Sequence, residues 1–546
     1  MATAAEAPAL FLRKATGLVK GWNPFDAFIY SFLSVNLVAL GLFNLSFAPF
    51  VAKGQPLTAA LITGVFVTFL VVVYAGLIST MPRAGGDYVW QSRIFGGGPA
   101  FVLAVTGWWF ILWQWAPIYG NILAVQFFQP IWATLKITKP VDASWFLTHN
   151  GIMTVSMITI VLAGIFVSLG MEGYSKVQRF CFYGGIVGLV VMFLLMLFNG
   201  QGAFHTAFNR EAANLFGTQG DAFSRTIQDS AKFGYKAPGF GFTPLGPSFL
   251  LIPFMVFYLL WPNWGASLYG EVRGASDFKR VYNGMFYGLW VTVGFSVVFF
   301  LLAAKTFGWG FYMAANSNWA NSYYAVQGAP TPAIPVWPYP AMMAGWLVHN
   351  QVFQLILILL MSLWFFGWAG TLFLSSTRVI FAAAFDRVLP EWAANVSERR
   401  HVPFGALALM LVPSIGVSAL YSYSPKFVTY TLAATLVIAV TYLGTVAAGA
   451  ILPWRRPRLW ANSPIARYKV GGVPLITVAG VITAGFLGYN LWKWFTDSTY
   501  GLNNKGSYVF MGSLYGLALV IYIVARVVRS RQGVNLAQIH QEIPVE

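Results

Sequence analysis

The sequence predicts an all-α polytopic membrane protein with twelve transmembrane helices. Of its 546 residues, 58% are hydrophobic and only 9% are charged, whereas a soluble protein carries about 25% charged residues. The mean hydropathy is +0.66, and the apolar residues form runs long enough to cross a bilayer core of about 30 Å. These runs lie near residues 24–48, 57–80, 99–128, 151–170, 179–199, 248–269, 282–308, 348–380, 403–424, 427–452, 474–496 and 507–528.

The distribution of basic residues predicts the orientation of these spans. If both termini lie on one side, that side holds about two thirds of the 33 Lys and Arg residues and most of the short loops. By the positive-inside rule this side is the cytoplasm. The sequence therefore predicts a multi-pass protein of the cell membrane with cytoplasmic tails at 1–21 and 531–546, both short and mobile.

Charge and cysteine content exclude several other classes. The net charge of +17 is concentrated in loops at one membrane face, which indicates topology and argues against a nucleic-acid partner. Cys181 is the single cysteine, so an internal disulfide and a Cys-rich metal centre are excluded. The predicted spans hold no paired acids and no nucleophile beside a base, so we expect neither an enzyme nor a cofactor.

The first and sixth spans contain residues that interrupt a membrane helix. In the sixth, Pro262 cannot donate to the helical ladder and Gly265 weakens it further; in the first, Gly41 lies in mid-membrane. Paired irregularities five spans apart predict a five-plus-five inverted repeat with a transport site at the breaks. For Pro262 alone, a kink with a purely structural role is the alternative.

This repeat divides the chain into units. The first five-helix repeat is expected at 22–199 and the second at 248–452, followed by helices 11 and 12 at 453–530. Two large outer connections, 200–247 and 309–347, are predicted either to cap an outer vestibule or to be variable loops.

The connection after the second span is specific in sequence rather than merely polar. Residues 82–93 read Pro-Arg-Ala-Gly-Gly-Asp-Tyr-Val-Trp-Gln-Ser-Arg. Gly85 and Gly86 allow the backbone to bend where a side chain would block it. Tyr88 and Arg93 suit a segment that lies along lipid headgroups, with an ordinary polar loop as the alternative.

Two of the chain's segments closely resemble the amino acid–polyamine–organocation (APC) superfamily of secondary transporters. Residues 82–93 are similar to that family's loop pattern Pro-x-x-Gly-Gly-x-Tyr-x-x-x-x-Arg. Arg378 through Asp386 to Pro390, followed by Pro403, is similar to its pattern after helix 8.

Two further segments resemble the family more loosely. Residues 26–43 look like its first helix, and Gly270-Glu271-Val272-Arg273 looks like the segment after its sixth. Ala39 and Trp261 stand where the family has glycines at the two breaks. These departures leave the expected fold intact, but the resemblance does not identify the substrate.

The resemblance implies a LeuT-type fold and an amino acid permease that works by alternating access. It also implies a site at the breaks, where amides near Leu40-Gly41-Leu42 bind a carboxylate and carbonyls near Tyr258-Leu259-Leu260 bind an ammonium group. The residues expected to bind substrate are Asn36, Ala39, Leu40, Gly41, Phe257, Tyr258, Trp261 and Asn263. Those expected to act in conformational change are Gly85, Gly86, Tyr88, Arg93, Glu271, Arg378 and Asp386.

The predicted midplane lacks ionisable residues, which would be costly there and usually functional. Asp26, Asp87 and Glu271 are all placed at the inner membrane edge. A cationic substrate would lack a central carboxylate, so a neutral amino acid is favoured. A transporter of polyamines or other organic amines and a non-transporting amino acid sensor are the alternatives, and the oligomeric state stays open.

The coupling ion is also left open. Gly185 stands where some proton-coupled relatives carry a lysine, while Thr371 and Ser375 offer hydroxyls for a possible Na⁺ site. Such hydroxyls more often bond to their own helix, so Na⁺ or H⁺ coupling, exchange and uniport are all retained. In span 3, Trp109 and Gln114 are candidates to line the cavity, while its tryptophans as a group are more often lipid-facing or packing residues.

Overall fold

The computed structural model describes residues 16–51, 53–237, 239–424, 427 and 434–543. It contains twelve helical segments that are long and apolar enough to cross a membrane, so the predicted number of spans is confirmed. Between these spans, the described part of the chain forms shorter helices and one hairpin of two-residue strands. The protein is therefore all-α, as its composition predicts.

Seven of the described spans are single α-helices. They are α3 (Pro56–Thr80), α8 (His149–Ser168), α9 (Gly170–Phe198), α18 (Phe404–Tyr423), α20 (Ala434–Arg455), α22 (Leu475–Thr496) and α23 (Lys505–Arg531). Two of them, α18 and α20, continue through an internal proline (Pro413 and Pro453).

The other five spans change helix type or divide. Span 1 comprises α1 (Pro24–Ser34), η1 (Leu37–Gly41) and α2 (Leu42–Leu45), and span 6 comprises α12 (Leu245–Leu259) and η6 (Trp264–Glu271). Span 3 comprises α5 (Gly97–Val105), η3 (Thr106–Phe110), α6 (Leu112–Leu123), η4 (Ala124–Phe128) and α7 (Gln129–Thr134). Span 7 comprises α13 (Phe278–Ala303), η7 (Ala304–Gly308) and α14 (Trp309–Tyr323), and span 8 comprises α16 (Gln351–Ala369) and α17 (Thr371–Phe385).

Shorter elements connect the spans. They are η2 (Ala48–Phe50), α4 (Gly86–Phe95), η5 (Ala143–Leu147), α10 (Gln201–Phe216), α11 (Ala222–Lys232), α15 (Pro340–Gly345), η8 (Glu391–Ala394), α21 (Pro457–Ala461), η9 (Pro464–Arg467), β1 (Lys469–Val470), β2 (Val473–Pro474), η10 (Ser498–Tyr500) and α24 (Leu536–Ile539).

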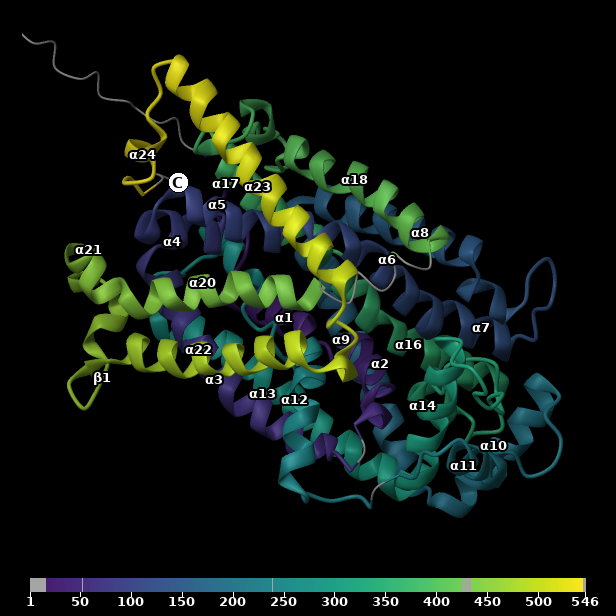
Figure 1. Cartoon of the computed structure of the whole chain (residues 1–546). Helices are drawn as coiled ribbons and strands as arrows, with labels where there is room; N and C mark the ends of the chain where they lie inside the picture. Colours follow the sequence, from purple (N-terminus) through teal and green to yellow (C-terminus); the bar gives the residue numbers. More distant parts are fainter. Residues whose placement is uncertain (1–15, 52, 238, 425–426, 428–433, 544–546) are drawn as a thin grey trace, which may run out of the picture.

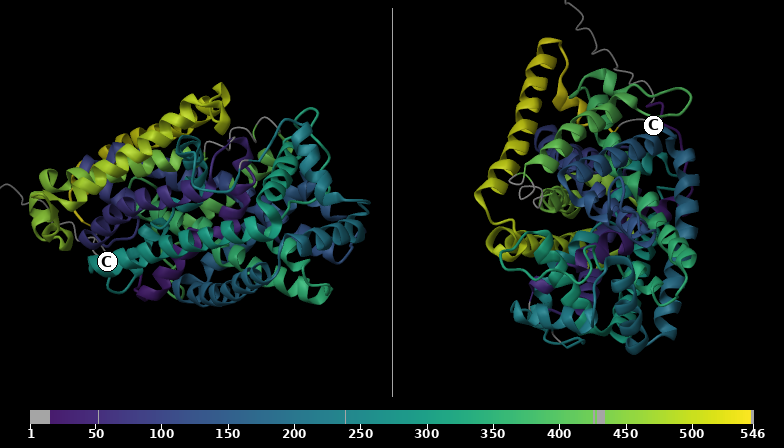
Figure 2. Two further views of the ribbon diagram at one scale, coloured as in Figure 1. Left: turned by 90° about the horizontal axis from the view of Figure 1, so that it is seen from below. Right: turned by 90° about the vertical axis from the view of Figure 1, so that its right-hand side faces the viewer.

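The spans form a bundle whose two ends carry different elements. Figure 1 shows α4, α21, α24 and β1 at one end, and α7, α10 and α11 at the other. The first span lies in the interior, because 94% of its most apolar stretch is buried. In α23 only 17% of the corresponding stretch is buried. Both views in Figure 2 place α23 along the outside of the bundle. The first span is therefore surrounded by protein, which a span with irregular backbone requires.

The described part of the connection 200–247 is largely helical and packs onto α14. The Phe223 ring of α11 stacks on Phe311 of α14 with 4.2 Å between ring centroids, and Phe204 of α10 lies 4.6 Å from Phe307. The described residues thus form a folded cover over this end. The sequence placed 309–323 in a loop, but these residues continue span 7 as α14, because their polar Asn and Ser side chains are buried against that cover.

Lys305, in η7, caps the end of a neighbouring helix. Its ammonium group donates to the carbonyl oxygens of Met196, Leu197 and Asn199, at 3.2, 2.7 and 2.8 Å. These carbonyls lie at the C-terminal end of α9, where the helix leaves acceptors without intrahelical partners. This charge near a membrane boundary therefore has a structural role.

The C-terminal tail differs from its prediction. It was expected to be mobile, but residues 536–543 fold back onto the bundle as α24 and the turn after it, with Leu536 and His540 buried. The Leu536 side chain and the packing of His540 against Gly97 anchor this segment. Most of the N-terminal tail lies outside the described residues.

Close helix contact makes Gly188 a test of the packing between α9 and α16. A Cβ at Gly188 would lie 2.9 Å from the Cβ of Leu360 and 3.0 Å from its backbone carbon, so the helices must separate to accept it. We expect Gly188→Ala to destabilise the protein by about 1–3 kcal/mol, measured as a lower melting temperature in detergent. Gly294→Ala on α13, where a Cβ meets nothing within 4 Å, is the control. Equal melting temperatures of Gly188→Ala and Gly294→Ala would contradict this close packing of α9 and α16.

Candidate substrate site

Asn36 lies where the helix of the first span is interrupted. The α-helix ends at Ser34 and the π-helical η1 begins at Leu37. The Asn36 Oδ1 accepts a hydrogen bond from the Ala39 amide at 2.7 Å, and its Nδ2 donates to the Trp364 carbonyl of α16 at 3.1 Å. Asn36 therefore caps the second half of the span and ties it to span 8.

The Asn36 cap changes which backbone amides lie at the N-terminal end of the second half of the first span. The amides of Leu40 and Gly41 donate to the Asn36 carbonyl, at 3.2 and 2.9 Å, and the Leu42 amide donates to the Leu37 carbonyl. The amides that the sequence assigned to a ligand carboxylate are thus used within the chain. Because the helix begins directly after the Asn36 cap, the backbone amides at its N-terminal end are those of Leu37 and Val38.

Gln126, which the sequence reasoning missed, supports the same segment. Its Nε2 donates to the carbonyls of Val38 and Ala39, at 3.1 and 3.0 Å. Ala39 therefore contributes both its amide and its carbonyl to fixing η1. A lone glutamine in an apolar run was the only signal for this role.

The sixth span is interrupted between Leu259 and Trp264. Pro262 offers no N–H to the Tyr258 carbonyl four residues earlier, and its own carbonyl accepts from the Ser31 hydroxyl of α1 at 2.8 Å. The Trp261 indole N–H donates to the Phe257 carbonyl at 2.6 Å. The carbonyl end of α12 is therefore held beside the first span.

The two interrupted spans meet at Gly41. A Cβ there would lie 3.0 Å from Cδ2 of Tyr258 and 3.1 Å from Cδ1 of Leu37. The structure thus brings the predicted residues of the first span, Asn36 to Gly41, against those of the sixth.

Aromatic rings surround the break in the sixth span. Trp115 of α6 stacks on Phe257, with centroids 5.5 Å apart, and meets Trp261 edge-on at 6.1 Å. Trp108 of η3 lies 4.7 Å from Trp264. Trp108 and Trp115 are buried against protein, so of the two structural alternatives they fit packing rather than contact with lipid.

Trp109 faces elsewhere. Its indole N–H, like that of Trp113, donates to the Leu409 carbonyl of α18, at 3.0 and 3.2 Å respectively. The structure therefore removes Trp109 from the candidate site. Gln114 is buried, and among the described residues neither of its side-chain polar atoms has a hydrogen-bond partner, so it stays a candidate.

Three buried polar groups gather where spans 3, 6 and 10 meet. Asn263 is fully buried, and neither polar atom of its side chain forms a hydrogen bond with the described part of the protein. The Trp108 indole N–H and the Tyr442 hydroxyl are likewise unpartnered within the described chain. Such groups are costly to bury unpaired, so they are suited to receive a polar ligand.

The hydroxyls considered for a cation have protein partners instead. Ser375 donates to the Trp264 carbonyl at 2.7 Å and lies 2.7 Å from the Tyr30 hydroxyl. The Thr371 hydroxyl lies 3.1 Å from the Tyr119 hydroxyl. In this conformation both residues tie α17 to neighbouring spans.

Two arginine–carboxylate pairs are buried at the end of the bundle that carries α4. Arg93 bonds Asp386 through two contacts of 2.5 and 3.0 Å, and Arg378 bonds Glu271 through contacts of 2.7 and 2.9 Å. All four side chains are at most 2% exposed. The structure thus brings together four residues expected to act in conformational change, although they lie far apart in sequence.

The glycine pair of the loop allows this end to close. Gly85 has φ +96° and Gly86 has φ +39°, in the region that favours glycine. A Cβ at Gly85 would lie 2.3 Å from the Ala382 Cβ, and one at Gly86 would lie 2.9 Å from the Ser267 amide. Because no side chain is present, the loop lies directly against α17 and η6.

Tyr88 contacts the C-terminal segment rather than lipid. Its hydroxyl lies 3.1 Å from Nε2 of His540, and Arg93 donates through Nε to the Glu542 carbonyl at 2.9 Å. Both residues are buried, so the expectation of a segment lying along headgroups is wrong for them. The returning tail covers this end of the loop.

Asp87 is fully buried between the second and third spans. Its Oδ1 accepts from the hydroxyls of Tyr74, at 2.5 Å, and Thr445, at 2.6 Å, while Oδ2 has no partner in the described chain. The titratable groups facing it are Tyr74 and Tyr442, and no described residue forms an ion pair with it. Burial raises the pKa of this carboxyl to about 6.

Asp87 should therefore make stability depend on pH. The folded protein binds this proton more tightly than the unfolded chain, so lowering the pH from about 7 through 6 towards 4 adds up to about 3 kcal/mol to the free energy of unfolding. Asp87→Asn removes this contribution and keeps both hydroxyl partners. We expect melting curves of the two proteins to diverge as the pH falls; parallel pH profiles would contradict the raised pKa.

A cavity of about 270 Å³ lies at the opposite end of the bundle. It is lined by Phe43 of the first span and Phe47 just after it, by Phe254 and Phe257 of α12, and by Tyr323 of α14 among others. Phe257 also belongs to the aromatic group around Trp261. The cavity therefore reaches from the end of α14 to an aromatic ring that packs beside the break in the sixth span, while the ion pairs lie at the other end.

Comparison with known proteins identifies the family of this chain. The family model described as amino acid permease matches residues 25–511, which include all but the first residue of span 1, ten complete spans and the start of the twelfth. No curated protein matches the chain. The match covers the loop, both interrupted spans and all four residues of the buried ion pairs. The chain belongs to the amino acid permease family.

Proposed function

We propose that this permease is a secondary active transporter for a neutral, zwitterionic amino acid, with its substrate site at the interruptions of spans 1 and 6. Membership of the family implies transport of amino acids. The observation that carries the finer proposal is the contact between the two interrupted spans at Gly41 and Tyr258. The Tyr258 ring packs against the turn from Leu37 to Gly41, which supports a site between the two interruptions.

These helix ends suit a zwitterion without any charged side chain. The amides of Leu37 and Val38 begin η1 and would bind the carboxylate, because the N-terminal end of a helix carries partial positive charge. The carbonyl of Tyr258, left without a donor by Pro262, would bind the ammonium group. Asn263 supplies further polar contacts from a buried position.

The rings of Trp115, Phe257 and Trp261 would enclose the side chain of the amino acid. They meet within 5.5 to 6.1 Å and offer an apolar surface. A cationic substrate such as a polyamine has less support, because the carboxylates of Asp26, Glu271 and Asp386 are already paired with arginines. Asp87 forms no ion pair with a described residue, but it already accepts hydrogen bonds from Tyr74 and Thr445.

The fold we propose is LeuT-type, with inverted repeats at 22–199 and 248–452 and two further helices at 453–530. Interruptions in corresponding spans of the two halves support it. We also propose that both tails are cytoplasmic, which puts the ion pairs inside and the 270 Å³ cavity outside. In this arrangement the site communicates with the outer side, as alternating access requires of one state.

Gly41→Leu should abolish substrate binding without preventing insertion. Its side chain would be forced between Leu37 and Tyr258, where even a Cβ lies within 3.1 Å of both. We would measure the rise in melting temperature caused by neutral, acidic and basic amino acids and by polyamines, in sodium or potassium salt. Gly294→Leu, in open space on α13, is the matched control.

The same panel separates the alternatives. Normal binding by Gly41→Leu would exclude this site, and a shift with polyamines alone would overturn the zwitterion assignment. Binding without uptake into proteoliposomes would favour a sensor. A shift that needs sodium would identify the coupling ion.

Trp261→Gly should widen the range of amino acids that bind. Removing the indole leaves space between Trp115 and Trp264, whose rings lie 6.1 and 5.3 Å from it. We expect larger side chains to gain affinity relative to small ones in the same melting assay, while Trp113→Gly, which faces α18, leaves the order unchanged. An unchanged order in Trp261→Gly would place the pocket elsewhere.

A further inference from the structure

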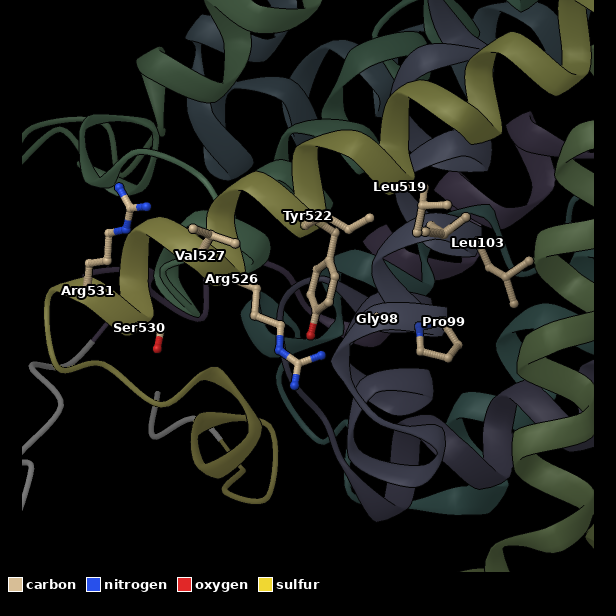
Figure 3. A pocket seen from close by; sticks show the side chains of 11 residues that line it. Gly98, Pro99, Leu103, Leu519, Tyr522, Arg526, Val527, Ser530 and Arg531 are labelled. Carbon is tan, nitrogen blue, oxygen red and sulfur yellow. The ribbon is translucent and has the colours of Figure 1, made fainter.

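A groove runs along the membrane-facing surface between α5 and α23. Its volume is about 1030 Å³, and Figure 3 shows side chains from both helices pointing into it. One stretch is apolar and is lined by Val102 and Leu103 of α5 and by Leu519, Ile523 and Val527 of α23. Leu519 and Ile523 are about half exposed, so the chain itself does not fill this stretch.

The groove continues into a basic pocket. Tyr522, Arg526 and Ser530 line the groove and also an adjoining cavity of about 630 Å³, which Arg455 and Arg456 line as well. Figure 3 shows the Arg526 guanidinium between α23 and the start of α5, beside the Tyr522 hydroxyl. Within the described chain, Arg455 and Arg526 form no ion pair, so their charge is available to an anion.

The apolar and basic parts of this groove follow one another in the same order as the acyl chains and the phosphate of a phospholipid. An apolar channel leads to Arg455 at the end of α20 and Arg526 near the end of α23, which form no ion pair with described residues and lie where Lys and Arg are concentrated. Acyl chains fit the first part, and a phosphate fits the second because arginine binds it through several donors. A soluble anion would have no use for the apolar stretch.

A second copy of the chain fits this surface less well. In a two-fold contact the same patch faces itself, so Arg455 and Arg526 of both copies would be brought together. The unbalanced positive charge therefore favours a negatively charged occupant.

We propose that this groove binds one anionic glycerophospholipid of the inner leaflet, with acyl chains between α5 and α23 and phosphate at Arg455 and Arg526. The assignment to the inner leaflet rests on the membrane orientation proposed above, but the site itself is independent of the transported substrate. Asn535 and His540 also line the basic pocket, so the headgroup would lie against the C-terminal segment.

The test is native mass spectrometry of the full chain in detergent with added dioleoyl phosphatidylglycerol, compared with dioleoyl phosphatidylcholine. We expect one phosphatidylglycerol to stay bound at concentrations where phosphatidylcholine does not. Each arginine near the headgroup contributes about 1 kcal/mol, so Arg526→Gln should weaken this binding about fivefold. Arg458→Gln, an exposed arginine outside the groove, should leave it unchanged.

The apolar stretch has its own pair of variants. Leu519→Trp fills the groove and should reduce binding of phosphatidylglycerol, whereas Leu517→Trp, on an equally exposed part of α23 that does not line the groove, should not. Each variant must melt like the unaltered protein before lipid is added, which separates loss of lipid from loss of fold.

Several results would overturn the proposal. Equal binding of the two lipids, or equal effects of Arg526→Gln and Arg458→Gln, would remove the headgroup site. Competition by inorganic phosphate as strong as that by the lipid would identify a soluble anion instead. A dimer in light scattering that Leu519→Trp dissociates would assign the groove to a second copy.

Discussion

Backbone polar groups inside a bilayer must find partners within the protein, and every irregular part of this fold satisfies that constraint. Where the first span leaves the α-helix, Asn36 supplies an acceptor to Ala39 and a donor to span 8. Where the sixth span breaks, Ser31 and the Trp261 indole take up the exposed carbonyls of Pro262 and Phe257. Beside these breaks, the polar atoms of the Asn263 side chain are buried without a partner in the described chain, and we assign them to the ligand.

The closed end depends on α17. It carries Arg378, which pairs with Glu271 after the sixth span, and it is followed by Asp386, which pairs with Arg93 of α4. Breaking one partner from such a buried pair leaves an uncompensated charge, which typically costs about 3–5 kcal/mol. The loop after span 2, span 6 and span 8 are therefore expected to move as one unit, and opening this end requires another partner or water for each charge.

Sequence alone predicts the spans and the loop well, because hydropathy and positive-φ glycines are local properties. Gly85 and Gly86 illustrate this, since their role follows from backbone geometry. Prediction from sequence alone fails where a side chain contacts a segment that is distant in the sequence. Gln126 supports η1 from span 3, and Asn36 shifts the amide end by capping it. The burial of Asp87 depends on Tyr74 and Thr445 of two other spans, so a residue placed at the membrane edge became the titrating group that the sequence did not reveal.

The docked C-terminal segment has a practical consequence for anyone who expresses this protein. Arg93 holds Asp386 with one part of its guanidinium and the Glu542 carbonyl with another, so the segment that contains Glu542 is a component of the closed face. An affinity tag or fluorescent fusion joined just beyond this segment would compete with that contact or pull it away. Tags at the opposite terminus leave Glu542 in place, and material purified in the two ways should be compared before its transport rates are taken as those of the untagged molecule.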